Sequence, residues 1–373
     1  SAVGGPDIKT FAQQTLKDAR NFGGSSIGTA RVRAVHERGA NLRFHLFDIK
    51  MNSGKSFRDA KSIGTSGTSY FNPTVLTNNV ILEDPLNNTL VYDTNRSRPR
   101  VIDPQQIEVQ ILRSGTSDGA GNFTVSIPTA YALTNTSDWL VFTPTGKLDN
   151  GTLGGITAGS NTTTITGLPN NTDISVYVYG VTSTPIVRAK TLTQNATVTT
   201  TIQTDPITGE QFLNLGQPDI FDIKRVTLND SDGADMEYKF TLDDGQRDNH
   251  YALGRLLLNA GQSAPASTPG VFVKFRHFDH GVSGDFFAIN SYTGQVTYDQ
   301  IPKYRFSTGT RVRLYNYLDF RSVMDSAGEF ASSGTGARVI ELPQPTSLVT
   351  ADVTYFLPQA GKLVIDKDGI IRT

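Results

Sequence analysis

Short segments in which apolar and polar residues alternate recur about every 8–12 residues between positions 105 and 203, with turn-forming residues between them. Alternation places successive side chains on opposite faces of a strand, so one face can be buried while the other meets water. Short strands at such regular spacing predict a β-sandwich. The expected strands are Ile107–Leu112, Asn122–Ile127, Trp139–Phe142, Thr162–Ile165, Ile174–Tyr179 and Ala196–Ile202.

The composition narrows the class of protein further. The chain has 373 residues, with 34 basic and 35 acidic side chains and a formal net charge of -1. A nearly neutral chain offers no global field for nucleic acid or for an acidic membrane surface. The absence of cysteine excludes disulfides and thiolate metal sites. No apolar run approaches the roughly 20 residues that a membrane-spanning helix needs.

A short identity on either side of the Thr-rich region indicates how the domains are arranged. The sequence Phe-Asp-Ile-Lys occurs at residues 47–50 and again at residues 221–224. It fits one β-rich core domain that a sandwich interrupts, or two related β units that flank the sandwich. We expect the first part of the core at residues 1–104, the inserted sandwich at 105–203, the second part of the core at 204–355, and the start of a following segment at 356–373.

The two ends of the chain carry local signals. Apolar residues between Ile8 and Arg20 fall on a loosely helical face and predict one short N-terminal helix. Residues 27–35 and 42–49 alternate as two strands across a short turn and predict a hairpin. The chain starts without methionine and stops just after a turn at 366–369, so we expect a fragment of a longer protein.

The stretch Lys239–Leu258 concentrates polar side chains between two apolar runs. Residues 238–243 alternate as a strand, and an Asp-Asp-Gly turn at 243–245 ends it. Five polar residues follow, including Arg247, a planar fork of donors with acidic neighbours on both sides. The pattern fits a corner held together by its own hydrogen bonds, or a binding or catalytic site. The corner is favoured, because no nucleophile with a base stands at a readable spacing.

An acidic turn carries the candidate metal site. Asp230, Asp232 and Asp235 place carboxylates around Gly233, as calcium loops fold several oxygens around a hard cation. The spacing does not match the helix-loop-helix calcium loop, so an acidic turn without metal is the alternative. Calcium at this turn is the only cofactor hypothesis that the sequence supports.

Other residues of catalytic or metal-binding type do not form a recognisable motif. His277 and His280, with Asp279 and Asp285, supply the ligand types of a metal site. Residues three apart on a strand point to opposite faces, however, and no third strong ligand is within sequence reach. No nucleophile elbow or phosphate loop appears, so no catalytic residue is assigned. A glycosidase needs only two carboxylates, so this class stays open.

The segment Thr163–Thr182 closely resembles the fibronectin type III pattern. In that family a Gly-Leu-Pro turn, here at residues 167–169, precedes a long alternating strand. Trp139 stands where the family keeps a core indole on an early strand. Ile174 occupies a position at which the family usually has tyrosine, which puts the family's corner hydrogen bond in doubt. Such modules most often act as spacers or adhesion units, so the resemblance argues against catalysis in this region.

Several motifs outside the sandwich carry a second resemblance. They are Leu242–Tyr251, Gly254–Leu256, Phe278–Gly281, Gly284–Phe287, Tyr298–Pro302, Leu318–Arg321 and Thr354–Pro358. Together they resemble an uncharacterised domain family in large structural proteins of contractile-tailed bacteriophages, notably those that infect cyanobacteria. The resemblance covers about residues 30–63 and 221–373, with the sandwich as an insertion. It implies a baseplate or tail-fibre component and supplies no established catalytic residues.

These observations predict a non-enzymatic structural component of a phage virion, located in the tail and made in the host cytoplasm. Its expected partners are other virion proteins and a host cell-surface glycan, without nucleic acid or membrane insertion. A homotrimer is expected by analogy with tail fibres. A capsid decoration protein would differ only in its place on the particle.

The alternative is a carbohydrate-binding or carbohydrate-active adhesin with a fibronectin III-like spacer. A groove lined with aromatic side chains and crossed by a carboxylate pair would then bind the glycan. The candidate groove residues are Tyr292, Tyr298, Tyr304, Tyr315 and Tyr317.

Overall fold

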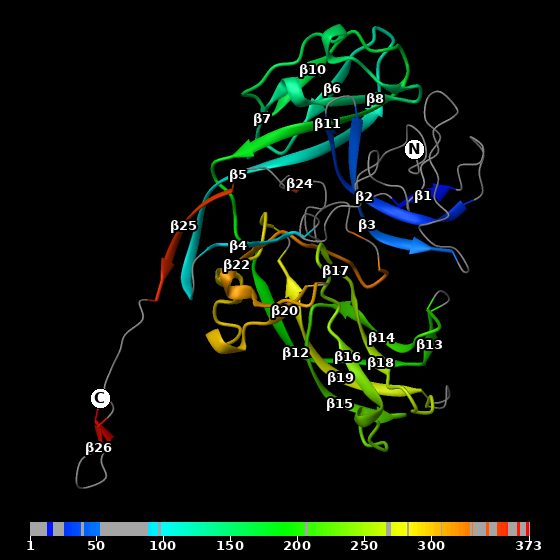
Figure 1. Cartoon of the computed structure of the whole chain (residues 1–373), viewed down its shortest axis with the longest axis vertical. Coiled ribbons are helices and arrows are strands. Elements are labelled where there is room, and N and C mark those ends of the chain that lie inside the picture. Colours follow the sequence, from blue (N-terminus) through cyan, green and yellow to red (C-terminus); the bar gives the residue numbers. More distant parts are fainter. Residues whose placement is uncertain are drawn as a thin grey trace.

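Strands dominate the protein (Figure 1). The structure is a computed structural model that describes residues 13–17, 26–38, 41–52, 89–95, 98–205, 208–265, 270–281, 283–306, 308–328, 330, 341–342, 349–356, 364–365 and 371–372. Every helical element within these ranges is a 3₁₀ turn of three or four residues. The mainly β fold class that the alternation predicts is therefore confirmed.

One end of the molecule is a β-sandwich (Figure 1). Its elements are β5 (Pro99–Thr116), β6 (Phe123–Ser126), β7 (Ala132–Thr134), η4 (Thr136–Asp138), β8 (Leu140–Thr143), β9 (Gly146–Lys147), η5 (Asn150–Thr152), β10 (Thr162–Ile165) and β11 (Asp173–Thr182). In one sheet β11 pairs with β5, β7 and β8, and β9 extends β8. In the other, β6 pairs with β10.

The sandwich core is apolar and includes the only tryptophan. Trp139 is fully buried, and its indole N–H donates to the carbonyl of Thr134 at 2.8 Å. Val109 from one sheet and Ile165 from the other pack in the same cluster. Ile174 is buried in this core, so its side chain fills the position with apolar surface and offers no hydroxyl. The predicted core role of the indole is confirmed, whereas the fibronectin III relationship stays a prediction.

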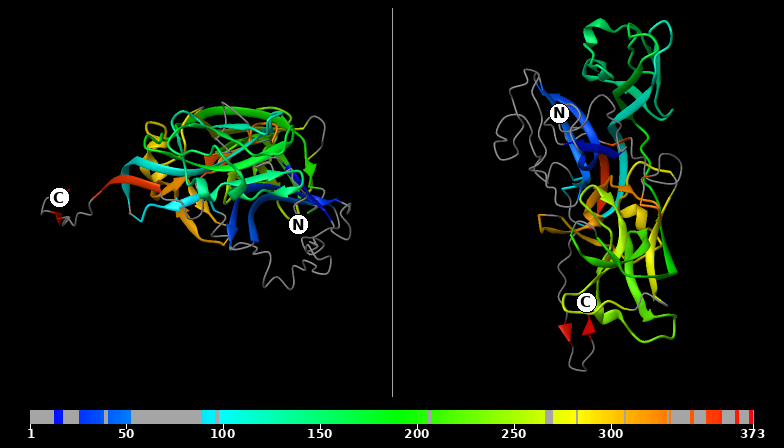
Figure 2. Two further views of the ribbon diagram at one scale, coloured as in Figure 1. Left: turned by 90° about the horizontal axis from the view of Figure 1, so that it is seen from above. Right: turned by 90° about the vertical axis from the view of Figure 1, so that its right-hand side faces the viewer.

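The other end of the molecule is a second β unit (Figures 1 and 2). Its elements are β12 (Lys190–Thr200), β13 (Gln203–Thr204), β14 (Gln211–Pro218), β15 (Ile220–Leu228), η6 (Glu237–Lys239), β16 (Phe240–Asp243), β18 (Leu253–Leu258) and β19 (Val271–His280). One sheet has the order β12-β19-β15 and the other the order β13-β14-β18-β16. Leu213 and Leu256 from the second sheet pack against Val273 and Phe275 from the first. The hairpin of β16 and β18 is the one that the central stretch predicts.

Short elements fill the region between the two units. They are β4 (Val91–Asp93), β17 (His250–Tyr251), η7 (Ile289–Tyr292), η8 (Tyr298–Gln300), β20 (Lys303–Arg305), β21 (Arg311–Arg313), η9 (Leu314–Asn316), β22 (Tyr317–Asp319) and β23 (Ser322–Val323). β4 pairs with β22, β20 with β21, and β17 with β23, the last pair being parallel. These pairs bring residues near position 90 beside residues near position 320.

The two ends of the chain add further strands. They are β1 (Gln13–Lys17), β2 (Ser26–Arg38), β3 (Asn41–Met51), β24 (Glu341–Leu342), β25 (Val349–Tyr355), β26 (Val364–Ile365) and β27 (Ile371–Arg372). β1, β2 and β3 form one antiparallel sheet, which confirms the hairpin predicted for residues 27–35 and 42–49. β24 and β25 both pair with β5, and β26 pairs with β27.

The helix predicted over Ile8–Arg20 is wrong for the part that the structure describes. Residues Gln13–Lys17 form β1, an extended strand paired with β2. Only a loose apolar periodicity supported the helix, and such local preference is weak enough for pairing with a neighbouring strand to override it.

Two predicted domain boundaries also need correction. The boundary between residues 104 and 105 falls inside β5, one continuous strand of 18 residues that pairs with β25 in its first half and with β11 in its second. The predicted last sandwich strand, Ala196–Ile202, overlaps β12, which pairs with β19 in the other unit. Alternation identifies a strand but not its partner, so sequence spacing placed this strand in the wrong sheet.

Candidate functional site

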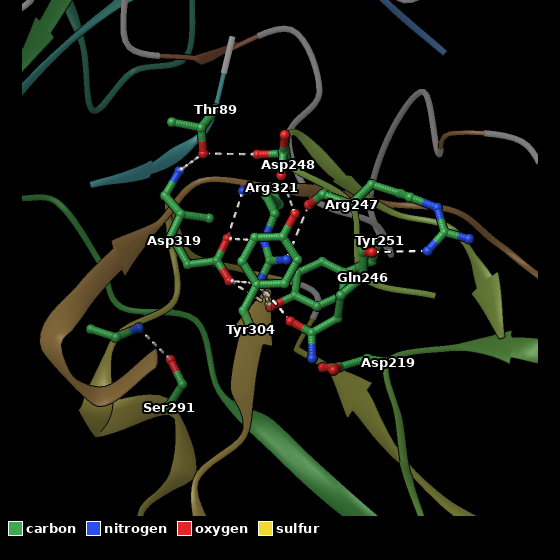
Figure 3. A network of polar contacts seen from close by, with 12 residues as sticks. Thr89, Asp219, Gln246, Arg247, Asp248, Tyr251, Ser291, Tyr304, Asp319 and Arg321 are labelled. Carbon is green, nitrogen blue, oxygen red and sulfur yellow. Dashed lines mark hydrogen bonds and ion pairs between the residues drawn. The ribbon is translucent and has the colours of Figure 1, made fainter. Parts of the chain in front are cut away.

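A network of charged side chains is buried where the middle region meets the second β unit (Figure 3). Lys190 comes from β12, Asp219 immediately precedes β15, Tyr251 lies in β17, and Asp319 ends β22. Arg321 follows two residues after Asp319. All five side chains are essentially inaccessible to solvent. Charged groups are almost never fully buried unless they are paired, so this cluster is the most unusual chemical feature of the described chain.

The first ion pair lies within the second β unit, and its lysine also contacts the middle region. The Lys190 ammonium donates to the Asp219 carboxylate at 2.6 Å and to the Tyr251 hydroxyl at 3.0 Å. A ring nitrogen of His280 lies 3.0 Å from the same Asp219 oxygen. Asp219 adopts a left-handed backbone conformation, φ 50°, which an Asp tolerates better than most residues.

The second ion pair is bidentate. Arg321 donates to the two carboxylate oxygens of Asp319 at 2.9 and 2.8 Å. The guanidinium also donates to the Tyr251 hydroxyl at 2.7 Å and to the Gln246 side-chain oxygen at 3.1 Å. Tyr251 donates in turn to Asp319 at 2.5 Å, so its hydroxyl connects the two pairs. Every guanidinium nitrogen has an acceptor, because Nη1 donates to the carbonyl of Arg247 at 3.1 Å.

The partners keep the network charged despite burial. Burial raises the pKa of Asp219, but the Lys190 ammonium and His280 outweigh it and hold this pKa below the usual value. Asp319 behaves in the same way beside Arg321. Burial lowers the pKa of Lys190, and the two aspartates oppose that shift. Burial lowers the pKa of His280 to about 4, so its ring is neutral at pH 7.

Aromatic rings surround the two cations. The Lys190 ammonium lies 4.5 Å from the ring centre of Tyr251, 4.6 Å from that of Phe287 and 5.1 Å from that of Tyr292. The Arg321 guanidinium lies 4.1 Å from the ring centre of Tyr251. Cation–π attraction is stronger in such a desolvated setting than at the surface.

This arrangement is suited to holding segments together and not to catalysis. Its charged atoms face one another, and a substrate has no access to side chains that are essentially unexposed. No nucleophile paired with a base appears among the contacts of these five side chains. The network therefore acts as a structural junction.

The central stretch forms the predicted corner at the edge of the network. Arg247 donates to both oxygens of Asp243 at 2.8 and 2.6 Å, and Arg255 lies 3.3 Å from the same carboxylate. Asp248 accepts a hydrogen bond from the hydroxyl of Tyr304. The acidic and basic residues of this stretch thus hold the corner through their own hydrogen bonds.

The three carboxylates of the acidic turn do not converge. Asp230 accepts from the backbone N–H of Asp232 at 2.9 Å, and Asp235 accepts from that of Glu237 at 2.9 Å. Gly233 is required because a Cβ there would lie 1.7 Å from a backbone oxygen. Within the described ranges, no group of three or more His, Cys, Asp or Glu side chains is placed to hold a metal ion. The segment is a turn stabilised by its own side chains. Its geometry does not support calcium binding by Asp230, Asp232 and Asp235.

The histidine pair does not form a common site either. His280 contacts Asp219 inside the network, whereas His277 lies 3.8 Å from Asp279. Their positions three apart on β19 explain the separation, as the strand geometry predicts.

The tyrosines of the alternative groove do not line one. Tyr292, Tyr304 and Tyr315 are buried in the core. Tyr298 and Tyr317 are only partly exposed, and Tyr298 stacks on Tyr315 with ring centres 4.3 Å apart. The aromatic groove that the adhesin alternative requires is therefore not formed by these side chains.

Sequence reasoning assigned none of the five network residues to a buried charged site. A signal was present for Lys190, because it shares the inward face of its strand with Leu192. A lysine at an inward position indicates a buried partner. Asp219, between strands, gave no comparable signal.

Comparisons with known proteins give no relative for this arrangement. No family model, no curated protein and no solved structure matches the chain. Among the described residues, no helix is long and apolar enough to span a membrane.

A double-mutant cycle tests the structural junction. Lys190→Met leaves Asp219 charged in the interior, so we expect the free energy of unfolding to fall by about 3–5 kcal/mol. Lys190→Met with Asp219→Asn should cost less than the sum of the two single changes, by about 1–3 kcal/mol. Urea unfolding followed by far-UV circular dichroism, which reports on the strands of both β units, measures these values. Lys224→Met, which breaks the surface pair with Asp222, is the control and should change stability by less than about 0.5 kcal/mol. Additive losses would contradict a coupled pair.

A second prediction concerns Asp244, to which none of the described residues pairs a cation. Burial raises its pKa to about 6, although the backbone N–H of Gln246 donates to it at 2.9 Å. The folded-state pKa exceeds the unfolded value, so ionising this carboxyl costs more free energy in the folded chain than in the unfolded chain. The free energy of unfolding therefore falls as the pH rises from about 4 to about 6. Asp244→Asn should therefore have a free energy of unfolding at pH 7.5 that is higher than that of wild type by roughly 1–2 kcal/mol. Urea unfolding measures the difference. The difference should vanish near pH 4, and equal stability at both pH values would contradict this assignment.

Proposed function

We propose that the protein is a non-enzymatic structural component of a phage virion, located in the tail baseplate or a tail fibre. The observation that carries the proposal is the closed network of Lys190, Asp219, Tyr251, Asp319 and Arg321. The segments in which the sequence resembles phage structural proteins meet at this network, where their polar side chains hydrogen-bond to one another. A buried network that holds segments together and gives no access to a substrate suits a protein whose role is structural.

The layout of the strands supports the same role. β5 passes without interruption from the sandwich to β25, so backbone hydrogen bonds connect these parts continuously. Figure 2 displays an elongated shape, with the sandwich at one end and the second β unit at the other. Leu192 and Phe278 of the second β unit belong to the same apolar cluster as the sandwich core. A spacer-like module packed against a second unit in this way can hold partners at a fixed separation.

The proposal includes the surroundings in which the chain works. It is made in the host cytoplasm and assembles with other virion proteins in the tail, as a homotrimer. A host cell-surface glycan is its external partner, and neither nucleic acid nor membrane insertion is part of the proposal.

Electron microscopy of phage particles tests the location. Antibodies against the purified chain should decorate the tails of intact particles of the phage whose genome encodes it. Decoration of the capsid would instead identify a decoration protein. Absence of the chain from purified particles would overturn a virion role altogether.

Light scattering tests the assembly state and the calcium hypothesis together. We expect the purified chain to have the mass of a trimer, with the same mass before and after addition of EDTA. A monomer would contradict the homotrimer. A mass change on chelation would show that a bound divalent ion matters, and would bring Asp230, Asp232 and Asp235 forward as its ligands.

A further inference from the structure

A pocket of about 330 Å³ lies beside the buried network and is not used by it. The central corner forms one wall and the hairpin of β20 and β21 forms the other. Ligand pockets typically range from about 300 to 1,000 Å³, so this one holds a single small group. Its lining residues are Asp244, Gln246, Lys303, Tyr304, Arg305 and Arg311.

The hairpin presents cations in an arrangement that is unfavourable by itself. Arg305 pairs directly opposite Arg311, and Lys303 directly opposite Arg313, so four cations share one face. Like charges directly opposite each other destabilise a strand pair. Lys303, Arg305 and Arg311 are exposed, and within the described ranges none of the three makes a side-chain hydrogen bond or ion pair. Tyr304, between Lys303 and Arg305 on β20, is almost fully buried and anchors the hairpin to the core, and it contributes to the pocket lining as well.

The wall across from the hairpin supplies hydrogen-bond acceptors. One oxygen of Asp244 accepts from the backbone of Gln246, while the other has only a 3.4 Å contact with the Gln246 amide. The Gln246 oxygen is occupied by Arg321 at 3.1 Å, which holds this side chain still. An Asp244 oxygen therefore has capacity left for a donor in the pocket. The pocket combines cations on one side with an acceptor on the other.

We propose that this pocket binds one sugar residue that carries an acidic substituent, a carboxylate or a phosphate, at the end or along the chain of a surface polysaccharide. The acidic group lies against Lys303, Arg305 and Arg311, and a sugar hydroxyl donates to Asp244. Charge-assisted bonds from arginine suit both carboxylate and phosphate. The inference rests on the proposed function, because it names the glycan class that the tail component contacts.

The pocket favours this class over other anions and over neutral sugars. A bare phosphate ion satisfies the cations but brings further negative charge towards Asp244. A neutral sugar leaves the cations unpaired. The small volume excludes a nucleic-acid strand, which needs an extended basic groove. A ligand with an acidic group on one side and hydroxyls on the other satisfies both walls.

Calorimetric titration of the full chain tests the proposal with four probes. We expect glucuronate or glucose 6-phosphate to bind at least about tenfold more tightly than glucose, since charge-assisted bonds contribute more than neutral ones. We expect the same margin over inorganic phosphate, because phosphate has no sugar hydroxyl for Asp244 and is repelled by its charge. The tighter of the two acidic sugars identifies carboxylate or phosphate as the natural substituent. Inorganic phosphate binding as tightly as both would overturn the sugar assignment, and so would absence of binding by either acidic sugar.

Variants locate the binding. Arg305→Gln with Arg311→Gln should weaken binding of the acidic sugar about tenfold or more. Arg225→Gln, an exposed arginine on β15, is the matched control and should leave the affinity unchanged. Asp244→Asn should reduce the preference for the acidic sugar over inorganic phosphate, because it removes the repulsion and weakens the hydroxyl contact. Thermal unfolding followed by far-UV circular dichroism, which reports on all the strands, verifies that each variant is folded. Unchanged affinity in the double variant would place the ligand elsewhere and overturn the proposal.

The two proposals fail separately. Tails decorated by antibody with no binding of acidic sugar would overturn the pocket assignment and leave the structural role intact. Binding of acidic sugar by a chain that is absent from particles would support the pocket and overturn the virion role.

Discussion

Two pairs of opposite charges lie together in the interior of the protein, and the arrangement of the surrounding segments depends on them. Each charge removed from water costs several kcal/mol unless a partner with good geometry compensates it. Lys190 and Asp219 compensate each other at 2.6 Å, Asp319 and Arg321 do so at 2.8 Å, and Tyr251 joins the pairs. These residues come from segments separated by many positions in the chain. Each pair is electrically balanced by itself, and the Tyr251 hydroxyl couples the two pairs because it accepts from Lys190 and Arg321 and donates to Asp319.

The network supplies directional information that an apolar core would lack. Apolar residues of similar volume often stabilise a protein as much as a buried ion pair does. The charges therefore do not differ from an apolar core in the stability that they provide. Asp319 holds the guanidinium of Arg321 in its own segment, and the remaining hydrogen bonds of this guanidinium run to Tyr251, Gln246 and the Arg247 carbonyl, about 70 positions away in the chain. The aromatic rings around Lys190 fix the position of its ammonium. We infer that the charges select one docking geometry for the middle region. The surface pair of Lys224 and Asp222 lacks this property because both side chains are partly solvated.

The sequence predicted local structure better than it predicted which segments meet. The hairpins at β2–β3 and β16–β18 and the corner at Arg247 follow from alternation, turn residues and charges close together in the chain. The partner of β12 did not follow, because alternation is the same in either sheet. Lys190 and Asp219 meet 29 positions apart, and no local pattern records such a pairing. The short N-terminal strand was mistaken for a helix because a loose apolar periodicity over so short a segment cannot distinguish the two periods.

The length of β5 has a mechanical consequence. Its 18 residues extend over about 60 Å and carry β25 along one stretch and β11 along the next. Hydrogen bonds in an antiparallel pair run perpendicular to the strands. A pull along β5 therefore loads many of these bonds at once, in shear, instead of opening them one after another from an end. A chain built in this way resists stretching along the strand far better than it resists peeling at the edges.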